Sequence, residues 1–225
     1  MNSPSDHLEV STNDLIRKKG VIFKKYSRTP FTGCSVEYHD NGQLRSKENW
    51  KDGEQDGLWE SYHDNGQLSF KGHHIDGEPD GLWEEYYENG QLESKENWKD
   101  GEQDGLREYY HDNGQLWFKD NWKDGKLEDG SRESYHDNGQ LSSKENWKDG
   151  IRDGLREYYT DNGQLMSKGN FKDGKKDGLH EWYHENGQLL STGNFKNGKL
   201  DGHWESYDDE GKLVSKDNYE EDERI

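Results

Sequence analysis

The chain has 225 residues, of which 26% are hydrophobic and 35% are charged, and its formal net charge is −19 at pH 7. So little aliphatic material excludes a thick core, and a charge of this sign disfavours direct binding to nucleic acid or to an anionic membrane surface. Aromatic residues still make up 12% of the chain and return at fixed positions, which favours an ordered protein over a disordered one.

The only cysteine is Cys34, so the chain cannot form an intramolecular disulfide. This fits a reducing compartment. The segment from Met1 to Val10 is polar and acidic and has no apolar stretch of the kind that marks an export signal. No apolar run approaches the roughly 18 residues that a membrane-spanning helix needs. We therefore expect a cytoplasmic protein.

Three regions follow one another along the chain. Residues 1–30 form a lead-in, in which residues 1–12 are expected to be mobile and Val21–Phe23 is predicted to be a strand that caps the first edge of a sheet. Residues 31–219 form a repeat array. Residues 220–225 form an acidic tail, which is expected to be solvated.

The array is defined by the string Asn-Gly-Gln-Leu, which returns every 24 residues, with one step of 25. Its seven copies begin at Asn41, Asn65, Asn89, Asn113, Asn138, Asn162 and Asn186, and a degenerate copy begins at Glu210. The extra residue lies within the turn segment 124–130, where it need not disturb strand pairing. A fixed period of this length is the signature of a repeat architecture.

Each copy reads as a β-hairpin. In residues 57–80, two short runs flank the turn His63-Asp64-Asn65-Gly66, and Asp76-Gly77 lies in the turn that leads to the next copy. Asn-Gly and Asp-Gly are strong hairpin signals because glycine supplies a positive φ. The pattern predicts an all-β fold, an elongated single-layer antiparallel meander of about eight 24-residue hairpins, with strands of about six residues.

Two hairpin registers compete. A two-residue turn would place Tyr62 opposite Ser69, whereas a three-residue loop with a glycine bulge would place Tyr62 opposite Leu68 and Ser61 opposite Ser69. The second register is favoured because it brings residues of matching size or opposite charge together in most copies. The pairs are Glu37 with Arg45, Ser61 with Ser69, Tyr109 with Trp117, Ser134 with Ser142, Tyr158 with Met166, and Trp182 with Leu190.

This register divides the side chains between two faces. The Tyr62 face is predicted to carry Leu58, Glu60, Tyr62, Leu68 and the aromatic column that includes His74, and it is interpreted as the stacking face because its residues recur in nearly every copy. The opposite face, called here the Trp59 face, varies from copy to copy. It is predicted to hold the lysine column as well.

The variable face is rich in Trp, Tyr and Arg, the residue types enriched at binding hot spots. The candidate partner-binding residues are Trp59, Trp83, Arg107, Tyr109, Trp117, Arg132, Arg156, Tyr158, His180, Trp182 and Trp204. An alternative interpretation is that these rings cover strand backbone and stack on the lysine column through cation–π contacts. The two interpretations can hold together.

The segment from Asn162 to Gly178, Asn-Gly-Gln-Leu-Met-Ser-Lys-Gly-Asn-Phe-Lys-Asp-Gly-Lys-Lys-Asp-Gly, resembles the MORN-repeat variant seen in bacteria. The lead-in from Asn13 to Gly20, followed by Pro30-Phe31-Thr32-Gly33, resembles the start of the YwqK-type antitoxin proteins of that group. The resemblance covers about residues 13–219. It implies a sheet of stacked hairpins and a protein-binding role, with toxin neutralisation or immunity as the named function.

Metal and catalytic patterns are weak. The turn histidines repeat at steps that place them roughly 10 Å apart, too far for shared ligation of one ion. The Asp-Gly loops, such as Asp52 to Asp56, could bind calcium but fit turn chemistry better. Cys34 occupies a packing position, and no phosphate loop or nucleophile elbow is present. We expect no enzyme activity, no cofactor and no metal.

Two functions from different classes remain at this point. The first is an antitoxin or immunity protein, for which an acidic chain with aromatic anchors suits a basic toxin by charge steering. The second is a structural scaffold that organises protein assemblies, including assemblies at a membrane. The sequence leaves the partner, the binding face and the oligomeric state open.

Overall fold

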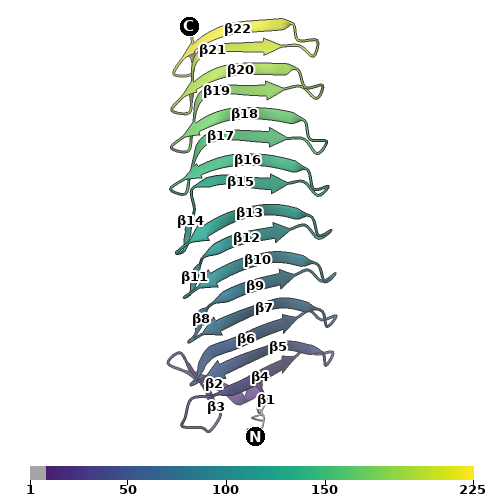
Figure 1. The fold of residues 1–225 in the computed structure, drawn as a ribbon, viewed down its shortest axis with the longest axis vertical. Coiled ribbons are helices and arrows are strands. Elements are labelled where there is room, and N and C mark those ends of the chain that lie inside the picture. Colours follow the sequence, from purple (N-terminus) through teal and green to yellow (C-terminus); the bar gives the residue numbers. More distant parts are fainter. Residues whose placement is uncertain (1–8) are drawn as a thin grey trace. The chain divides into compact units, whose positions relative to one another are not determined.

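The computed structural model describes residues 9–225, which fold into two compact units. The first unit extends to Gly114 and includes Trp122–Gly125, and the second comprises Gln115–Asn121 and Lys126–Ile225. Within each unit, successive strands lie side by side in one antiparallel layer (Figure 1). The predicted all-β, single-layer antiparallel meander is thus confirmed. The exception to all-β structure among the described residues is one turn of 3₁₀ helix, Thr12–Asp14.

The first unit contains strands β1 to β12. Their bounds are β1 (Glu9–Ser11), β2 (Leu15–Lys18), β3 (Val21–Lys24), β4 (Gly33–Tyr38), β5 (Leu44–Lys51), β6 (Glu54–Tyr62), β7 (Leu68–Ile75), β8 (Glu78–Pro79), β9 (Gly81–Tyr86), β10 (Leu92–Lys99), β11 (Glu102–Gln103) and β12 (Gly105–Tyr110). From β4 onward each long strand pairs antiparallel with the next long strand. The two-residue strands β8 and β11 pair with the end of the preceding long strand and come just before the main strand of their hairpin.

The second unit repeats this arrangement from β13 onward, although the last two residues of β13, Trp122 and Lys123, belong to the first unit. Its strands are β13 (Leu116–Lys123), β14 (Lys126–Leu127), β15 (Gly130–Tyr135), β16 (Leu141–Lys148), β17 (Ile151–Tyr159), β18 (Leu165–Lys172), β19 (Lys175–Tyr183), β20 (Leu189–Lys196), β21 (Lys199–Tyr207), β22 (Leu213–Glu220) and β23 (Glu223–Arg224). Neighbouring strands pair antiparallel here as well.

The first edge of the array is covered by the lead-in, although by a different segment than expected. Strand β1 pairs in parallel with β4, whereas the predicted strand Val21–Phe23 pairs with β2 in a separate two-stranded sheet. Ile22 instead closes a small apolar core with Val10, Phe31 and Trp50. Of the segment expected to be mobile, residues 1–8 lie outside the described part of the chain, and Glu9–Ser11 form β1.

The last residues also form structure. Strand β23 folds back along the end of β22, with Tyr219 opposite Arg224. The Arg224 guanidinium forms an ion pair with the Asp217 carboxylate. The segment that the sequence suggested to be a solvated tail therefore lengthens the terminal hairpin.

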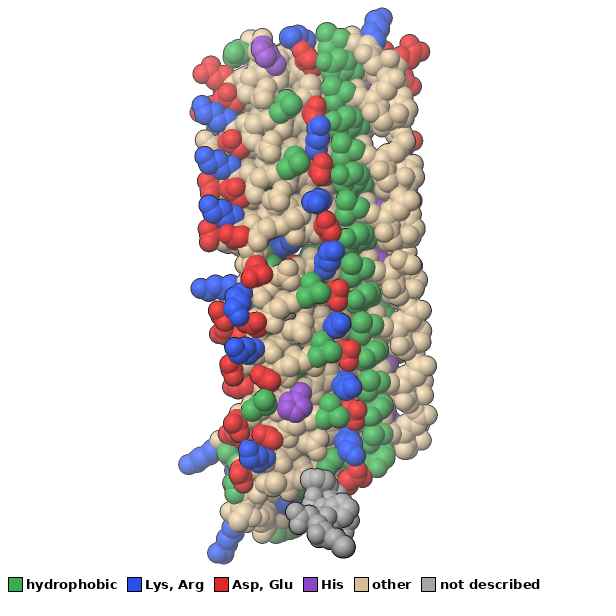
Figure 2. All heavy atoms as spheres, in the orientation of Figure 1, with side chains coloured by type: hydrophobic (Ala, Val, Ile, Leu, Met, Phe, Trp, Pro, Cys, Tyr) green, Lys and Arg blue, Asp and Glu red, His purple; other side chains and the backbone are tan. Residues whose placement is uncertain are grey.

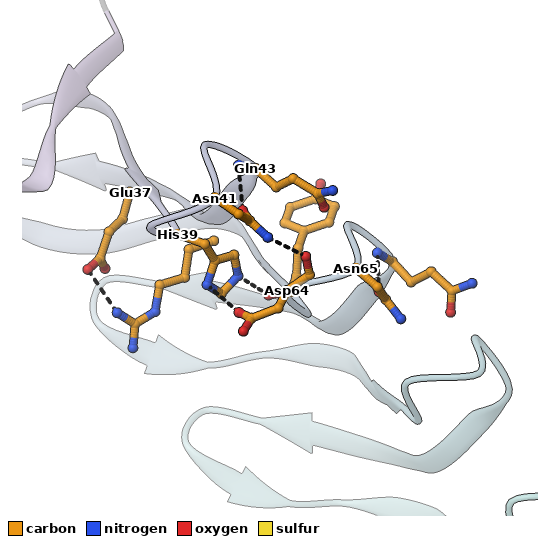
Figure 3. A network of polar contacts seen from close by, with 9 residues as sticks. Glu37, His39, Asn41, Gln43, Asp64 and Asn65 are labelled. Atoms are coloured by element: carbon orange, nitrogen blue, oxygen red, sulfur yellow. Dashed lines mark hydrogen bonds and ion pairs between the residues drawn. The ribbon is translucent and has the colours of Figure 1, made fainter.

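The recurrent motif builds the hairpin turn. In the first copy, the Asn41 side-chain oxygen accepts a hydrogen bond from the Gln43 amide at 2.9 Å, and the Asn41 side-chain nitrogen donates to the Asp64 carbonyl of the next copy at 2.7 Å. Figure 3 shows this asparagine between the two turns. The His39 ring also reaches the next copy, through the Tyr62 carbonyl at 2.8 Å and the Asp64 carboxylate at 2.7 Å. The period of 24 residues therefore reflects contacts between adjacent turns.

The turns at the other end of the strands are linked in the same way. Asp76 and Gly77 have φ of 47° and 85°, the left-handed pair that a tight Asp-Gly turn requires. The Gly77 amide donates to the Gln55 carbonyl of the previous copy at 2.8 Å. The equivalent amides of Gly101, Gly174 and Gly198 bond in the same way. The Asp-Gly loops thus have the turn role that the sequence favoured.

The predicted hairpin register is confirmed next to the turn and is wrong for the pairs beyond it. Tyr62 lies opposite Leu68, as the three-residue loop predicts, but Ser61 lies opposite Phe70, because Ser69 is an extra residue in a β-bulge. The expected pair of Ser61 with Ser69 does not form, and the equivalent pairs of the other described hairpins shift by one residue as well.

The bulge corrects the assignment of faces. Gly57 lies opposite His74, and Trp59 lies opposite Gly72. The aromatic column that includes His74 therefore belongs to the Trp59 face, and not to the Tyr62 face as predicted. Glu60 lies opposite Lys71, so the lysine column belongs to the Tyr62 face. The side chains of Trp50, His74, Ser94 and His180, all on the Trp59 face, are buried.

The turn network predicts a measurable loss of stability on Asn89→Ala. This change removes the hydrogen bonds from the Asn89 side chain to the Gln91 amide and to the Asp112 carbonyl. We expect the free energy of unfolding of the first unit to fall by about 1–2 kcal/mol in urea titrations, because each such bond contributes about 1 kcal/mol. The exposed neighbour Glu88→Ala is the control. Equal unfolding midpoints for both variants would contradict a structural role for the motif.

Candidate protein-binding surface

The Trp59 face has a central row of residues that lie opposite one another from strand to strand. In the first unit the row is Ser35, Glu48, Trp59, Gly72, Trp83, Glu96 and Arg107. In the second unit it is Asp120, Arg132, Glu145, Arg156, Gly169, His180, Gly193, Trp204 and Asp217. Bulky or cationic residues alternate with an acid or a glycine along each row.

Size and charge are matched along the central row. A Cβ atom at Gly72 would lie 2.9 Å from the Trp83 ring, and one at Gly193 would lie 2.3 Å from the Trp204 ring. Glycine is therefore required where a large ring leans on the neighbouring strand. An acid stands where the neighbour is an arginine, as with Glu145 and Arg156, whose Oε1 and Nε atoms lie 2.7 Å apart.

In the first unit, Trp59 and Trp83 are the centre of an aromatic cluster. Their ring centroids lie 6.2 Å apart in an edge-to-face arrangement, and both contact Phe70 and His74. Trp83 extends the cluster to Trp98 at 5.5 Å. Aromatic pairs in this geometry stabilise by about 0.5–1.5 kcal/mol beyond the area that they bury. The buried Trp59 Nε1 atom has no hydrogen-bond partner.

The cluster is followed by a polar group around Arg107. Its guanidinium lies over the rings of Trp122 and Tyr109, at 4.6 and 5.6 Å. The Tyr109 hydroxyl donates a 2.7 Å hydrogen bond to Glu96. Burial and this neighbouring carboxylate raise the pKa of Tyr109 to about 12, so the tyrosine stays neutral and remains a donor.

In the second unit, arginines replace tryptophans in the row. The Arg132 guanidinium lies 3.8 Å from the Trp147 ring centroid, and the Arg156 guanidinium lies 4.0 Å from that of Tyr158. Glu145 holds Arg156 and also Arg152, whose Nε lies 3.0 Å from its Oε2 atom. Stacking and ion pairing together fix these cations in place.

His180 fills the row between two glycines and is only 4% exposed. Its Nε2 lies 2.8 Å from the Asn170 carbonyl, and its ring lies 4.9 Å from Phe195 and 6.0 Å from Trp182. Burial lowers the pKa of His180 below its usual value. The imidazole is therefore neutral and packs as an aromatic ring. Trp182 in turn contacts Trp204 at 5.4 Å.

The Tyr62 face carries a ladder of glutamates and lysines. Glu133 lies 3.3 Å from both Lys119 and Lys144, and Glu181 lies 2.8 Å from Lys168. Figure 2 shows such alternating charges beside a strip of hydrophobic side chains. The tyrosine hydroxyls complete the ladder, since Tyr135 donates to Glu133 at 2.7 Å. These partners explain how a column of glutamates is accommodated on this face.

The expected stacking of lysines on the variable tryptophans is not formed by the ladder lysines. Lys119 and Lys168 lie over Tyr135 and Tyr183, at 5.8 and 5.9 Å, on the Tyr62 face. The cations that stack on the Trp59 face include arginines of the central row, Arg152 and Lys176. Lys176 lies 5.1 Å from the Trp182 ring centroid and 4.7 Å from that of Phe195.

All eleven candidate residues lie on the Trp59 face, yet they differ in accessibility. Trp59, Trp83, Arg107, Tyr109, Arg132, Arg156, Tyr158, Trp182 and Trp204 are half-buried, His180 is buried and Trp117 is 51% exposed. Four of them belong to the first unit and seven to the second. Most are therefore part of the packed layer of their own sheet, and their role in binding stays a prediction.

The candidates chosen from the sequence include Trp117 of the column at the bulge, called here the bulge column, but not its other apolar members. After Leu68 the next side chain points to the Trp59 face, and Arg45 at the equivalent position reaches Glu37 there at 3.2 Å. In the second unit this column reads Trp117, Ser142, Met166, Leu190 and Val214. Met166, Leu190 and Val214 are 50%, 40% and 67% exposed. The apolar character of these residues was visible in the sequence. Their exposure follows from the bulge.

The described residues contain no group of three or more His, Cys, Asp or Glu side chains arranged to hold a metal ion. Cys34 is buried, and burial raises the pKa of its thiol, so it lacks the thiolate character of a nucleophile. Within residues 9–225, no helix is long and apolar enough to cross a membrane.

The buried His180 predicts a pH dependence of stability. Below the unfolded-state pKa of about 6.5, the unfolded chain takes up a proton that folded His180 resists, so stability falls as pH falls. We expect His180→Trp, the residue found at Trp204, to lose less stability than the wild type between pH 7.5 and 5.5 in urea titrations. His73→Gln, on an exposed side chain, is the control. Parallel pH profiles for wild type and His180→Trp would refute this role.

The chain was compared with known proteins. The pattern of the MORN repeat variant family matches residues 31–52, 55–76, 79–100, 103–124, 128–149, 152–173, 176–197 and 200–221. No curated protein matches the chain. Crystal structures of TcdB2-TccC3-Cdc42 and TcdB2-TccC3 are similar at 16% and 12% identity over 86% and 84% of this chain, with TM-scores of 0.23 and 0.19. The chain spans 13% and 14% of the length of those chains. TM-scores this low do not establish a shared fold.

Eight copies of the motif match the family pattern over most of residues 31–221, and they fold as successive hairpins. The chain belongs to the MORN repeat variant family.

Proposed function

We propose that this chain is a non-enzymatic protein-binding repeat protein that recognises its partner with the Trp59 face of the second unit. The exposed bulge column of Trp117, Met166, Leu190 and Val214 is the observation that supports the proposal. Large apolar side chains exposed in a line are a feature of interaction sites. Tyr158 and Trp182 lie on the same face and add the aromatic anchors of a hot spot.

The finer proposal is that binding neutralises the partner, as an antitoxin or immunity protein does. The net charge of −19 supports a basic toxin as the partner, because opposite charge raises the rate of encounter. The same charge disfavours nucleic acid and anionic lipid as partners. A cytoplasmic location and the absence of cofactor and metal are part of this proposal.

A scaffold function is the second candidate, and one observation favours it. On the Tyr62 face, Leu82 and Leu106 of the first unit are exposed at the same position of their copies, and so are Leu155 and Leu179 of the second unit. A protein with apolar lines on both faces could contact two partners at once. An antitoxin needs only one such contact.

The proposal predicts that partner capture depends on the bulge column. Trp117→Ala combined with Met166→Ala should weaken capture of the partner from the native host at least tenfold, because exposed anchors are removed without disturbing the packed row. Leu155→Ala combined with Leu179→Ala on the Tyr62 face is the matched control. Loss of the partner in the control alone would place binding on the other face.

Neutralisation is tested with the captured protein itself. If the captured protein is a toxin, its activity should fall to background at a one-to-one ratio with the wild-type chain and recover with the Trp117/Met166 variant. A captured protein that remains fully active while bound would overturn the antitoxin proposal and favour the scaffold. Capture of no protein by the wild type would overturn protein binding as a whole.

A further inference from the structure

In several copies an acid of the central row pairs with the residue seven positions later, and one copy has a cation at that later position without the acid. Glu48 accepts a hydrogen bond from Gln55 at 3.2 Å, Glu96 accepts one from Gln103 at 2.9 Å, and Glu145 holds Arg152 at 3.0 Å. Glu48, Glu96 and Glu145 thus each bind the polar or cationic residue seven positions later, whereas Asp120 is followed at this spacing by Leu127. The same spacing joins Asp217 to Arg224.

Where the row has glycine in place of the acid, the residue seven positions later is normally apolar. Gly72 is followed by Pro79, and Gly193 is followed by Leu200. Gly169 is the exception, because Lys176 follows it. Among the described residues, Lys176 makes no ion pair within 4 Å. Its contacts are cation–π contacts with Trp182 and Phe195. This copy therefore has the cation, Lys176, but has Gly169 where other copies have the acid that pairs with the residue seven positions later.

A pocket of about 150 Å³ lies at this place on the Trp59 face of the second unit. Gly169, which has no side chain, and the small Ser167 line one part of it, whereas Tyr158, Phe171 and Trp182 supply aromatic walls. Arg156, Lys176 and the buried His180 also line it. The His180 ring fills the space that a side chain at residue 169 would take, and the pocket lies beside this ring with Arg156 and Lys176 in its lining.

The local charge is positive although the chain is acidic. Along this part of the row, Glu145 faces Arg152 and Arg156. The next acid position is Gly169, so one carboxylate stands against Arg152, Arg156 and Lys176. Aromatic walls exclude water from the cations and strengthen their attraction for an anion.

We propose that this pocket binds the carboxylate of an aspartate or glutamate side chain that a partner protein presents. The incoming carboxylate would lie beside the His180 ring and pair with Lys176 and Arg156, much as the Glu145 carboxylate pairs with Arg152 and Arg156. The volume favours one side chain over a small-molecule ligand, since ligand pockets usually measure about 300–1,000 Å³. The inference rests on the proposed protein-binding function and names one anchor of it.

This anchor is compatible with an overall basic partner. Long-range attraction depends on the net charge of −19, whereas the contact in the pocket depends on the few charges around it. A basic protein that presents one acidic side chain beside an apolar patch would match both the pocket and the exposed bulge column.

The direct test uses a small probe of the side chain. N-acetyl-glutamate amide, titrated into the full-length protein at low salt and followed by NMR, should shift the signals of Lys176 and Trp182 with a millimolar Kd. The neutral isostere N-acetyl-glutamine amide should bind at least tenfold more weakly. Equal binding of the two probes would overturn the proposal. Tighter binding of inorganic phosphate than of the glutamate probe would also overturn it, in favour of a free oxyanion.

Two variants test the residues. Lys176→Gln introduces the amide found at Gln55 and Gln103, and it should weaken binding of the glutamate probe at least fivefold. Lys175→Gln, an exposed neighbour that removes the same charge, should leave the Kd unchanged. Equal Kd values for wild type and Lys176→Gln would remove Lys176 from the site.

A third variant fills the pocket from within the chain. Gly169→Glu combined with His180→Arg recreates the arrangement of Glu145 and Arg156, and the paired change is needed because a Cβ at residue 169 would lie 2.0 Å from the His180 ring. A folded double variant should no longer bind the probe, and retained binding would contradict the proposed placement of the carboxylate.

The two proposals can fail separately. If the partner is captured equally by wild type and Lys176→Gln, protein binding stands and this pocket is not its anchor. If the wild type captures no partner but the glutamate probe binds with the expected selectivity, the pocket is a carboxylate-binding site. Its assignment to a protein partner is then overturned.

Discussion

The packing of the central row on the Trp59 face is the interaction on which the rest of each unit depends. A single-layer sheet has no second layer to cover it, and this chain has few aliphatic residues to spare. Burial is instead achieved between strands, where a Trp, His or Arg side chain leans across its neighbour. This packing requires a suitable residue on the neighbouring strand. Opposite Trp204 that residue is Gly193, which leaves room for the ring, and opposite Arg156 it is Glu145, which carries the opposite charge. Each substitution in the row is therefore constrained by the residues on both sides.

The same constraint affects how residue differences between copies at the central-row position are interpreted. The sequence shows Trp, Arg and His alternating at one position, which is typical of a recognition surface. The structure shows that Gly or an acid alternates with them on the adjacent strand, so much of the variation is matched inside the molecule. Variation that is not matched is more informative. The exposed bulge column is one such place, and Lys176 beside Gly169 is another, because no acid accompanies the cation.

The strand ends are held by a separate set of contacts. At one end, Asn41 and His39 reach backbone carbonyls of the next turn. At the other end, Gly77 donates to the preceding turn. Both sets satisfy polar groups that an acidic, solvent-exposed loop would otherwise leave to water. They also fix the offset between copies, which leaves the faces of the sheet free to vary. This division explains why the turn motif recurs so strictly while the row does not.

The sequence by itself determined the repeat period, the hairpin turns and the alternation of side chains, because these depend on local chemistry: Asn-Gly and Asp-Gly fix the turn, and a strand alternates with a period of two. It also found the three-residue loop that places Tyr62 opposite Leu68. Only the tertiary structure decided the strand pairing beyond that loop. The bulge at Ser69 shifts every later pair by one residue, and a one-residue shift moves the His74 column and the lysines to the other face. A bulge has no fixed residue signature at this position, where the copies read Arg45, Ser69, Trp117 or Met166. The bulge is a property of the pairing between two strands, and the pattern along one strand does not contain it.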